Sequence, residues 1–476
     1  MVKSGEVAWV QPKDKGTRPG PRSGHTTTCT REKAIIFGGC GVQEGRSAIF
    51  NETYILHISD GFRWELADVT GDVPSPRWRH TATLLPDNNS ILVFGGLCKG
   101  KRFNDTHVFD VDAKEWKAME IAGYPPHPRS HHTATLVEFD EEEDGEAEKK
   151  IFIIGGYGGV GSCRDFSMDV VALDLDTWTW SKLERLKGPA PKPRADHAVS
   201  VAGNQLILSG GRGASAKGFS GYFDDVHVLD LAEQEWKRPP GYQPGAADAA
   251  GGGWPALPSP LWNHTAQAIE SVPSYKMFVF GGQKKEFDYS GTVSVLDTGR
   301  MVWTAPVIAG TPPDAREDCS VSYDAKTCNL VYFGGWRQGW LDDLWCLNVA
   351  GIVGPPYAVQ SVEPATGPVT GNTPVIVKGL GFVESTMVQV KFSDGKREAT
   401  VAGKYVSPEQ ARARPAAALF PPPPHFSSPF FLTPPSLRRS RATRRPSRSL
   451  ARSTSSSASP SRATRSPSTR RRSRST

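Results

Sequence analysis

Arginine and histidine recur in this sequence as pairs three residues apart. The four pairs are Arg22/His25, Arg77/His80, Arg129/His132 and Arg194/His197. Histidine ligates metals and transfers protons near neutral pH, so such a series could form a metal site or an acid–base site. Each histidine, however, lies roughly 55 residues from the next and has its own arginine, and buried polar groups normally find hydrogen-bond partners. We therefore predict that the pairs brace the fold.

This interpretation excludes several kinds of site. We expect no catalytic residue, no cofactor and no bound copper, iron or zinc, because metal ligands of mixed type at fixed spacing are absent from the sequence. The pattern itself lapses twice, at Leu261/His264 and at Arg316/Cys319.

The elements that must position these pairs are short β-strands. Between Pro74 and Trp116, four runs rich in β-branched and aromatic residues alternate with turns of Gly, Asn, Asp and Pro, which predicts one meandering antiparallel sheet. Its second strand ends in Gly-Gly, and residues without Cβ let backbones approach closely. The same glycine pair recurs at spacings of 57, 60, 55, 71 and 53 residues, beginning at Gly38, Gly95, Gly155, Gly210, Gly281 and Gly334.

A tryptophan follows each glycine pair except the last. Trp64, Trp116, Trp180, Trp236 and Trp303 end the first five units. The sixth unit offers only Trp345 in its third strand, whereas Trp9 stands unassigned near the N-terminus. The simplest arrangement is a closed ring in which the N-terminal strand completes the last unit, because closure removes exposed strand edges.

The combined pattern of Pro-Arg-x-x-His, apolar-Gly-Gly, an acidic third strand and a late tryptophan resembles the kelch family, whose period is about 50 residues. The acids of the third strands are Asp110, Asp174, Asp230 and Asp297, which we interpret as scaffold. The resemblance implies an all-β fold, with residues 1–353 forming a six-bladed β-propeller closed by the N-terminal strand.

Residues 357–408 resemble the opening of an IPT/TIG domain, an immunoglobulin-like β-sandwich. The resemblance rests on a Pro-x-x-Gly turn at Pro364–Gly367 and on Gly379-Leu380-Gly381-Phe382. It covers about 50 residues, whereas a complete sandwich takes about 100. We therefore expect an incomplete sandwich.

Residues 409–476 are Pro-rich and then Arg/Ser-rich, which predicts a disordered tail. After residue 410 the chain holds 15 of its 56 basic residues, all arginine, and none of its 50 acidic ones. The rest of the chain therefore carries a net negative charge, although the whole chain has a net charge of +6. The tail could bind RNA or acidic partners by charge, could be a phosphorylatable nuclear-targeting segment, or could be non-native sequence. The abandoned sandwich favours the last, so we expect nucleic-acid binding only if the tail is native.

The remaining composition points to an intracellular protein. The seven cysteines are scattered without Cys-x-x-Cys or zinc spacing, and no apolar run is long enough to span a membrane. Two insertions, at 138–150 and 241–260, interrupt the period, and the first is strongly acidic. We expect both to be solvated loops, with no calcium site.

The loops after each Gly-Gly pair are the candidate site, since the kelch resemblance implies that they emerge on one face with the crossings between blades. Arginine beside large aromatic side chains is the composition of interaction hot spots. We predict that this face binds a partner through Lys99, Lys101, Arg102, Arg164, Arg212, Tyr222, Lys284, Lys285, Trp336, Arg337 and Trp340.

Three functions remain open. The first is a non-enzymatic scaffold for an acidic protein partner, cytoplasmic and, as the resemblance implies, in a cytoskeletal or ciliary assembly, with no membrane contact. The second is an enzyme similar to galactose oxidase or to nitrile-specifier proteins, which also use kelch blades. The third is nucleic-acid association through the Arg-rich tail.

Overall fold

The structure is a computed structural model of the whole chain. It describes residues 7–139, 148–159, 165–214, 220–239, 257, 259–271, 274–353, 358–364, 374–380, 389–393, 398–407 and 410–413. Almost every regular element in these ranges is a β-strand, and α1 (Ala350–Val353) is a single short helix. The all-β prediction is confirmed.

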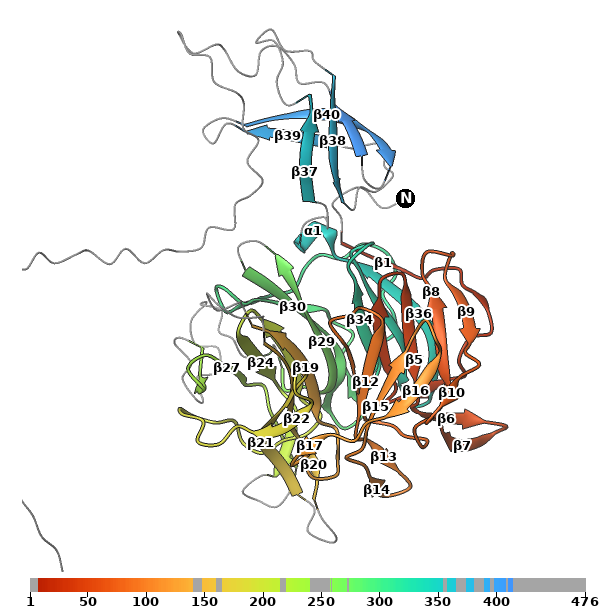
Figure 1. Cartoon of the computed structure of the whole chain (residues 1–476), viewed down its shortest axis with the longest axis vertical. Coiled ribbons are helices and arrows are strands. Elements are labelled where there is room, and N and C mark those ends of the chain that lie inside the picture. Colours follow the sequence, from red (N-terminus) through yellow and green to blue (C-terminus); the bar gives the residue numbers. More distant parts are fainter. Residues whose placement is uncertain are drawn as a thin grey trace, which may run out of the picture. The chain divides into compact units, whose positions relative to one another are not determined.

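Six antiparallel blades follow one another around a ring (Figure 1). From the inner to the outer strand, each blade is a four-stranded meander. Blade 1 is β4 (Thr26–Thr30), β5 (Lys33–Phe37), β8 (Thr53–His57) and β9 (Arg63–Leu66); blade 2 is β11 (Thr81–Leu84), β12 (Ser90–Phe94), β15 (Thr106–Asp110) and β16 (Glu115–Ala118); blade 3 is β19 (Thr133–Glu138), β20 (Lys149–Gly158), β21 (Asp165–Asp174) and β22 (Thr179–Lys182).

The second half of the ring repeats this plan and closes it. Blade 4 is β23 (Ala198–Ala202), β24 (Gln205–Ser209), β27 (Val226–Asp230) and β28 (Glu235–Lys237); blade 5 is β29 (Trp262–Ser271), β30 (Ser274–Lys285), β32 (Ser294–Asp297) and β33 (Val302–Thr304); blade 6 is β34 (Ser320–Asp324), β35 (Asn329–Trp336), β36 (Trp340–Asn348) and β1 (Ala8–Val10). Strand β1 pairs antiparallel with β36, Trp9 opposite Leu347. The predicted closure by the N-terminal strand is confirmed.

Apolar side chains fill the space between neighbouring blades. Every pair of neighbours shares one buried cluster, and the cluster between blades 5 and 6 also takes in Trp9. The Trp9 ring lies 5.2 Å from the ring of Phe280 and 5.1 Å from that of Tyr332. The core is therefore a circle of interfaces, and each blade depends on both neighbours for burial.

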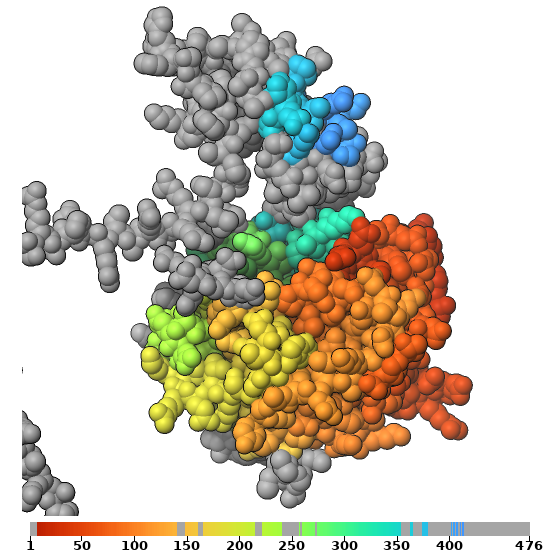
Figure 2. Space-filling model, viewed as in Figure 1, coloured from red at the N-terminus to blue at the C-terminus, as the bar shows by residue number. Residues whose placement is uncertain are grey.

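Short additions to the blades were not foreseen. Two-residue strands β2 (Lys15–Gly16), β10 (Thr70–Gly71) and β17 (Ala122–Gly123) pair in parallel with the outer strands of blades 1, 2 and 3. Hairpins extend the loops after the glycine pairs: β6 (Cys40–Gln43) with β7 (Arg46–Ile49), β13 (Leu97–Cys98) with β14 (Lys101–Arg102), and β25 (Arg212–Ala214) with β26 (Ser220–Tyr222). The first two project from one side of the ring (Figure 1), and β6–β7 forms the red protrusion in Figure 2.

A separate five-stranded sheet follows the propeller, as the IPT/TIG resemblance implied. Its order is β37 (Ala358–Glu363), β38 (Val375–Leu380), β41 (Gln410–Ala413), β40 (Glu398–Ser407) and β39 (Gln389–Ser393). Strand β41 begins at Gln410, beyond the limit of 408 expected from the sequence. The domain boundaries remain predictions. Residues 414–476, and with them the tail hypotheses, lie outside the described residues, as does 140–147 of the acidic insertion.

Candidate functional site

The arginine of each predicted pair is a buried brace. Arg77 is fully buried and makes a two-pronged ion pair with Asp105, at 2.7 and 2.8 Å, while its Nη1 also donates to the Gly95 carbonyl. Arg129, Arg194 and Arg316 repeat this arrangement with Asp169, Asp225 and Asp343, and Arg22 pairs with Glu52. The structural interpretation of the arginines is confirmed. Blade 5, with Leu261 in this position, lacks the brace.

The histidine of each pair ties its blade to the preceding one. Nε2 of His80 lies 3.1 Å from the Thr26 hydroxyl, and that of His25 lies 2.7 Å from Ser320, which joins blade 1 to blade 6. Ala198 has no hydroxyl to offer His264, and Ser209, its cross-strand neighbour, supplies one at 3.2 Å. Burial, reinforced by Arg22, lowers the pKa of His25 to about 3, so this imidazole is neutral at neutral pH.

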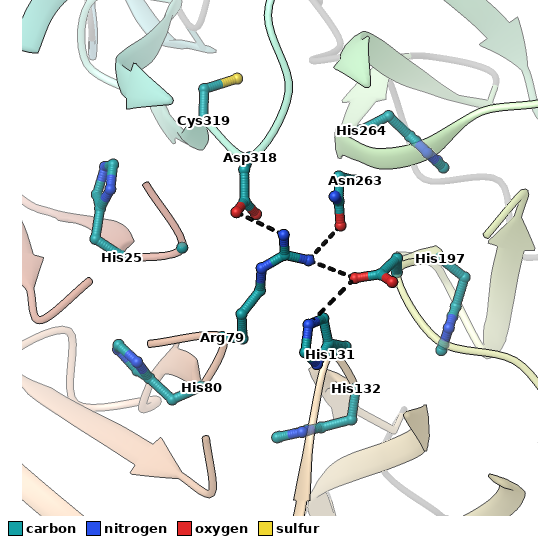
Figure 3. A pocket seen from close by; sticks show the side chains of 12 residues that line it. His25, Arg79, His80, His131, His132, His197, Asn263, His264, Asp318 and Cys319 are labelled. Atoms are coloured by element: carbon teal, nitrogen blue, oxygen red, sulfur yellow. Dashed lines mark hydrogen bonds and ion pairs between the residues drawn. The ribbon is translucent and has the colours of Figure 1, made fainter. Parts of the chain in front are cut away.

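The residue before each of the five histidines, and before Cys319 in blade 6, lies towards the ring axis (Figure 3). These six residues form what we call the hub ring: Gly24, Arg79, His131, Asp196, Asn263 and Asp318. All have left-handed φ angles, from 55° to 62°. Each donates its backbone N–H to the carbonyl of the member in the preceding blade, at 2.7–3.2 Å, which closes a circle of six hydrogen bonds. Glycine, Asn, Asp and His tolerate this conformation best, which explains most of the residue types.

One guanidinium joins four blades at the centre of the hub ring (Figure 3). Arg79 of blade 2 donates to Asp196 of blade 4 at 2.5 Å and to the Asn263 amide oxygen of blade 5, and it pairs with Asp318 of blade 6 at 2.7 Å. Burial alone would raise the pKa of Asp196, but His131, Arg79 and Arg212 outweigh it and lower the pKa to about 2. Asp196 is therefore a permanent anion that holds the cations around it.

The acidic side chains on the blade 6 side of the hub ring have their negative charge less well compensated. Burial raises the pKa of Asp318 despite Arg79, and it raises the pKa of the neighbouring Glu317, which accepts a 2.7 Å hydrogen bond from Asn263. The hub ring lines a cavity that we call the channel mouth, and its volume is only about 130 Å³, whereas small-molecule sites usually enclose at least roughly 300 Å³. The mouth therefore suits surface contact better than enclosure of a substrate.

One of the predicted site residues is tied directly to the hub ring, and a second reaches it through Ser130, whose hydroxyl lies 2.7 Å from Nδ1 of His131. Arg212 donates to Asp196 at 2.5 Å and lies 4.9 Å from the Trp262 ring, on which Tyr222 stacks. Arg102 donates to the Ser130 hydroxyl at 3.2 Å and lies 4.7 Å from the Tyr157 ring. Both guanidinium groups are thus held in place before any partner arrives.

The other predicted residues lie further out on the same loops. Trp336 and Trp340 form an edge-to-face pair 4.9 Å apart, and Arg337 pairs with Asp314 at 2.7 Å. Lys99, Lys101 and Lys285 are exposed and Lys284 is half-buried; among the described residues none of the four has an ion-pair partner. Arg164 lies outside the described residues. Free positive charge is therefore found on the lysines of the loops rather than at the channel mouth, and the site as a whole stays a prediction.

The hub ring escaped the sequence interpretation, although a signal existed. In five of the six units the residue before this histidine or cysteine is Gly, His, Asn or Asp. These residue types are enriched at left-handed φ. The braces had a similar signal, since Asp105 and Asp225 each precede the acid of the third strand by five residues. Within the described part of the chain, no group of three or more His, Cys, Asp or Glu side chains could hold a metal ion, and no helix is long and apolar enough to cross a membrane.

Comparison with known proteins agrees with this architecture. Residues 24–249 and 254–366 match the KLHDC2/KLHL20/DRC7 Kelch-repeats domain, and residues 356–430 match the IPT/TIG domain. The dynein alpha chain of the flagellar outer arm of Chlamydomonas reinhardtii is 39% identical over 421 residues, 86% of this chain and 9% of that protein.

Shorter stretches of the chain resemble other proteins. Acyl-CoA-binding domain-containing protein 4 of Arabidopsis thaliana is 30% identical over 69% of this chain and 45% of its own length. The Rab9 effector protein with kelch motifs of Rattus norvegicus is 28% identical over 46% of this chain and 55% of its own. The chain thus spans less than two thirds of each of these relatives. With its six blades, five of them braced by an arginine, and its match across most of its length, the chain belongs to the kelch-repeat family, and an IPT/TIG domain follows its propeller.

Proposed function

We propose that this protein is a non-enzymatic scaffold whose loop face binds an acidic segment of a protein partner. The observation that carries the proposal is that Lys99, Lys101, Lys284 and Lys285 lie on the loops after the Gly-Gly pairs, as do Arg102 and Arg212, whose guanidinium groups are already held against aromatic rings. Exposed lysines steer an acidic partner and speed its association. Pre-positioned arginines and aromatic side chains lower the entropy lost on binding.

We further propose a cytoskeletal or ciliary setting. Support comes from the resemblance over most of this chain to a protein named as a flagellar outer-arm dynein chain. The small cavity at the channel mouth, lined by ion-paired side chains, favours a scaffold over an enzyme.

Co-sedimentation with demembranated axonemes at increasing salt tests both parts. The intact chain should pellet at low salt and be released as salt rises, because exposed charges are screened. Replacing Lys99, Lys101, Lys284 and Lys285 by Glu should abolish pelleting. The matched control replaces Lys33, Lys114, Lys149 and Lys326, which lie in or beside turns at the strand ends opposite the Gly-Gly loops, by Glu and should pellet normally. Equal pelleting of both variants would contradict the proposed face.

A second variant separates steering from contact. Trp336→Ala removes one ring of an edge-to-face pair on the same face. It should speed dissociation from axonemes with little change in association rate, because buried aromatic area acts mainly on the lifetime of a complex.

A further inference from the structure

The outer edges of the blades are covered in a constant way. In blades 1, 2 and 3 the cover is β2, β10 or β17, and in blades 4 and 6 it is a single parallel bridge, Lys187 to Glu235 and Ala309 to Ala8. Each cover comes from the crossing that enters its blade. An uncovered edge would expose unpaired N–H and C=O groups.

Every cover contains a glycine in the same register. The residue before the glycine pairs with the residue before the blade's outer tryptophan, as Thr70 pairs with Glu115. A Cβ on the glycine would lie 2.0–2.5 Å from the tryptophan carbonyl oxygen, and φ there is 75–91°, so no other residue fits. The glycine always stands six residues before the brace arginine: Gly16, Gly71, Gly123, Gly188 and Gly310.

Blade 5 departs from this rule in sequence. Leu261 replaces its brace arginine, and six residues earlier stands Pro255. Proline fixes φ near −65° and therefore cannot take the place of the glycine.

Within the described residues, which leave out 240–256 of the crossing into blade 5, this blade also departs from the rule in structure. Among the described residues, nothing pairs with the outer side of β33. Trp303 is only half-buried, whereas Trp9, Trp64, Trp116, Trp180 and Trp236 are at most 5% exposed. Its indole N–H is buried without a hydrogen-bond partner in the same set of residues, and nearby Val307 is 95% exposed.

We propose that the outer edge of β33 is a docking site for an extended, glycine-containing segment of a protein partner, which adds to blade 5 as a parallel strand. Strand addition to a free sheet edge is a common mode of peptide recognition. The covers of the other blades specify the chemistry of this segment. Its glycine lies over the Trp303 carbonyl, and the residue before it pairs with Val302.

The cover of blade 1 offers a model for an acidic residue in the partner, although the other four covers have Val69, Ile121, Leu186 and Ile308 at the same place. In blade 1, Asp14 stands two residues before the cover glycine and accepts a 2.6 Å hydrogen bond from the indole of Trp64. A carboxylate at that place in the partner would accept from the indole of Trp303, which is otherwise unpaired. This site is on the rim of the propeller and is independent of the loop face.

The test uses the intact chain labelled with ¹⁵N-tryptophan, because the label reports both the backbone amide and the indole of each of the 13 tryptophans. Trp303→Phe assigns the two Trp303 signals. The probe is a synthetic peptide of residues 11–19, the cover of blade 1, at millimolar concentration. It should shift both Trp303 signals and leave those of Trp64 and Trp236 in place.

Two altered peptides and one exchange measurement complete the test. The Gly16→Ala peptide should shift neither Trp303 signal, and the Asp14→Ala peptide should shift the backbone amide more than the indole. In the free chain, the Trp303 amide should exchange with solvent at least tenfold faster than the Trp116 amide. Equal protection of the two amides would mean that the chain covers its own edge, and this outcome or the absence of peptide-induced shifts would overturn the proposal.

Discussion

At the scale of single residues, buried charge is tolerated here because each charge has a designated partner. Arg77 and Arg194 have no exposed surface, yet each finds a carboxylate and a carbonyl within 3.0 Å. Breaking such a pair from one side leaves a buried charge uncompensated.

Asp225→Ala, which leaves the fully buried Arg194 without its carboxylate, is therefore expected to lower the free energy of unfolding by about 3–5 kcal/mol. The matched control is Asp60→Ala, which breaks the exposed Lys15–Asp60 pair, where both side chains are more than half exposed, and should cost less than about 1 kcal/mol. Urea denaturation of the two variants measures the difference. Similar losses would mean that the brace does not support the blade.

The histidines between blades predict a pH dependence of stability. Burial lowers the pKa of His25 and His197 to about 3 and that of His264 to about 4. Between these values and about 6.5 the unfolded chain binds protons that the folded chain does not, so the free energy of unfolding should fall as pH drops from 6.5 towards 4. Thermal unfolding across this range measures the slope.

His80→Gln tests the origin of that slope, because burial also holds the pKa of His80 well below its usual value. The variant should reduce the slope between pH 5 and 6.5 by up to about 1.4 kcal/mol per pH unit. The exposed His127→Gln is the control and should leave it unchanged. A slope unaffected by His80→Gln would assign the pH dependence to other groups.

At the scale of elements, the sequence predicts the strands and misses their covers. Four strands per unit follow from β-branched runs between turn residues, which are local signals. The covers β2, β10 and β17 are two residues long, and no periodicity can be recognised in so short a stretch. The hub ring was missed for another reason: its members are far apart in sequence, and closure of the ring alone brings them together.

Gly71→Ala should weaken the cover of blade 2. A Cβ at Gly71 would lie 2.1 Å from the Trp116 carbonyl oxygen, so β10 must move away. Gly100→Ala is the matched control, since Gly100 has a similar φ of 83° and open space around it. Both variants carry a backbone strain of about 1–2 kcal/mol, but Gly71→Ala alone should also speed hydrogen exchange of the amide of Asp72, which donates to the Trp116 carbonyl.

At the scale of the whole molecule, stability depends on closing the ring. The prediction of closure succeeded because six glycine pairs faced five tryptophans, and Trp9 completed the count. The loop face was harder to predict, because sequence shows where arginines stand and not which acids neutralise them. Arg212 and Arg337, counted as free charge, are ion-paired.

Trp9→Ala tests closure directly. The side chain is 5% exposed and packs between blades 5 and 6, so its truncation should cost about 3–5 kcal/mol. Calorimetry should show one transition moved to lower temperature, because each blade buries its apolar side chains against its neighbours. A separate early transition of blade 6 alone would show that the blades unfold independently.

The direction of the hydrogen bonds in the hub ring has a topological consequence. Every member donates backwards to the preceding blade, and Gly24 donates to Asp318 as the others do to their predecessors. A circle of identical steps has no first or last member. Because Ala8 lies opposite Asn348, a short linker could join the two ends of the propeller. Circular permutants opened at any of the crossings between blades 1 and 4 would keep all six hydrogen bonds of the hub ring. The fold of the propeller therefore depends on the order of the blades around the axis and does not depend on which blade comes first in the chain.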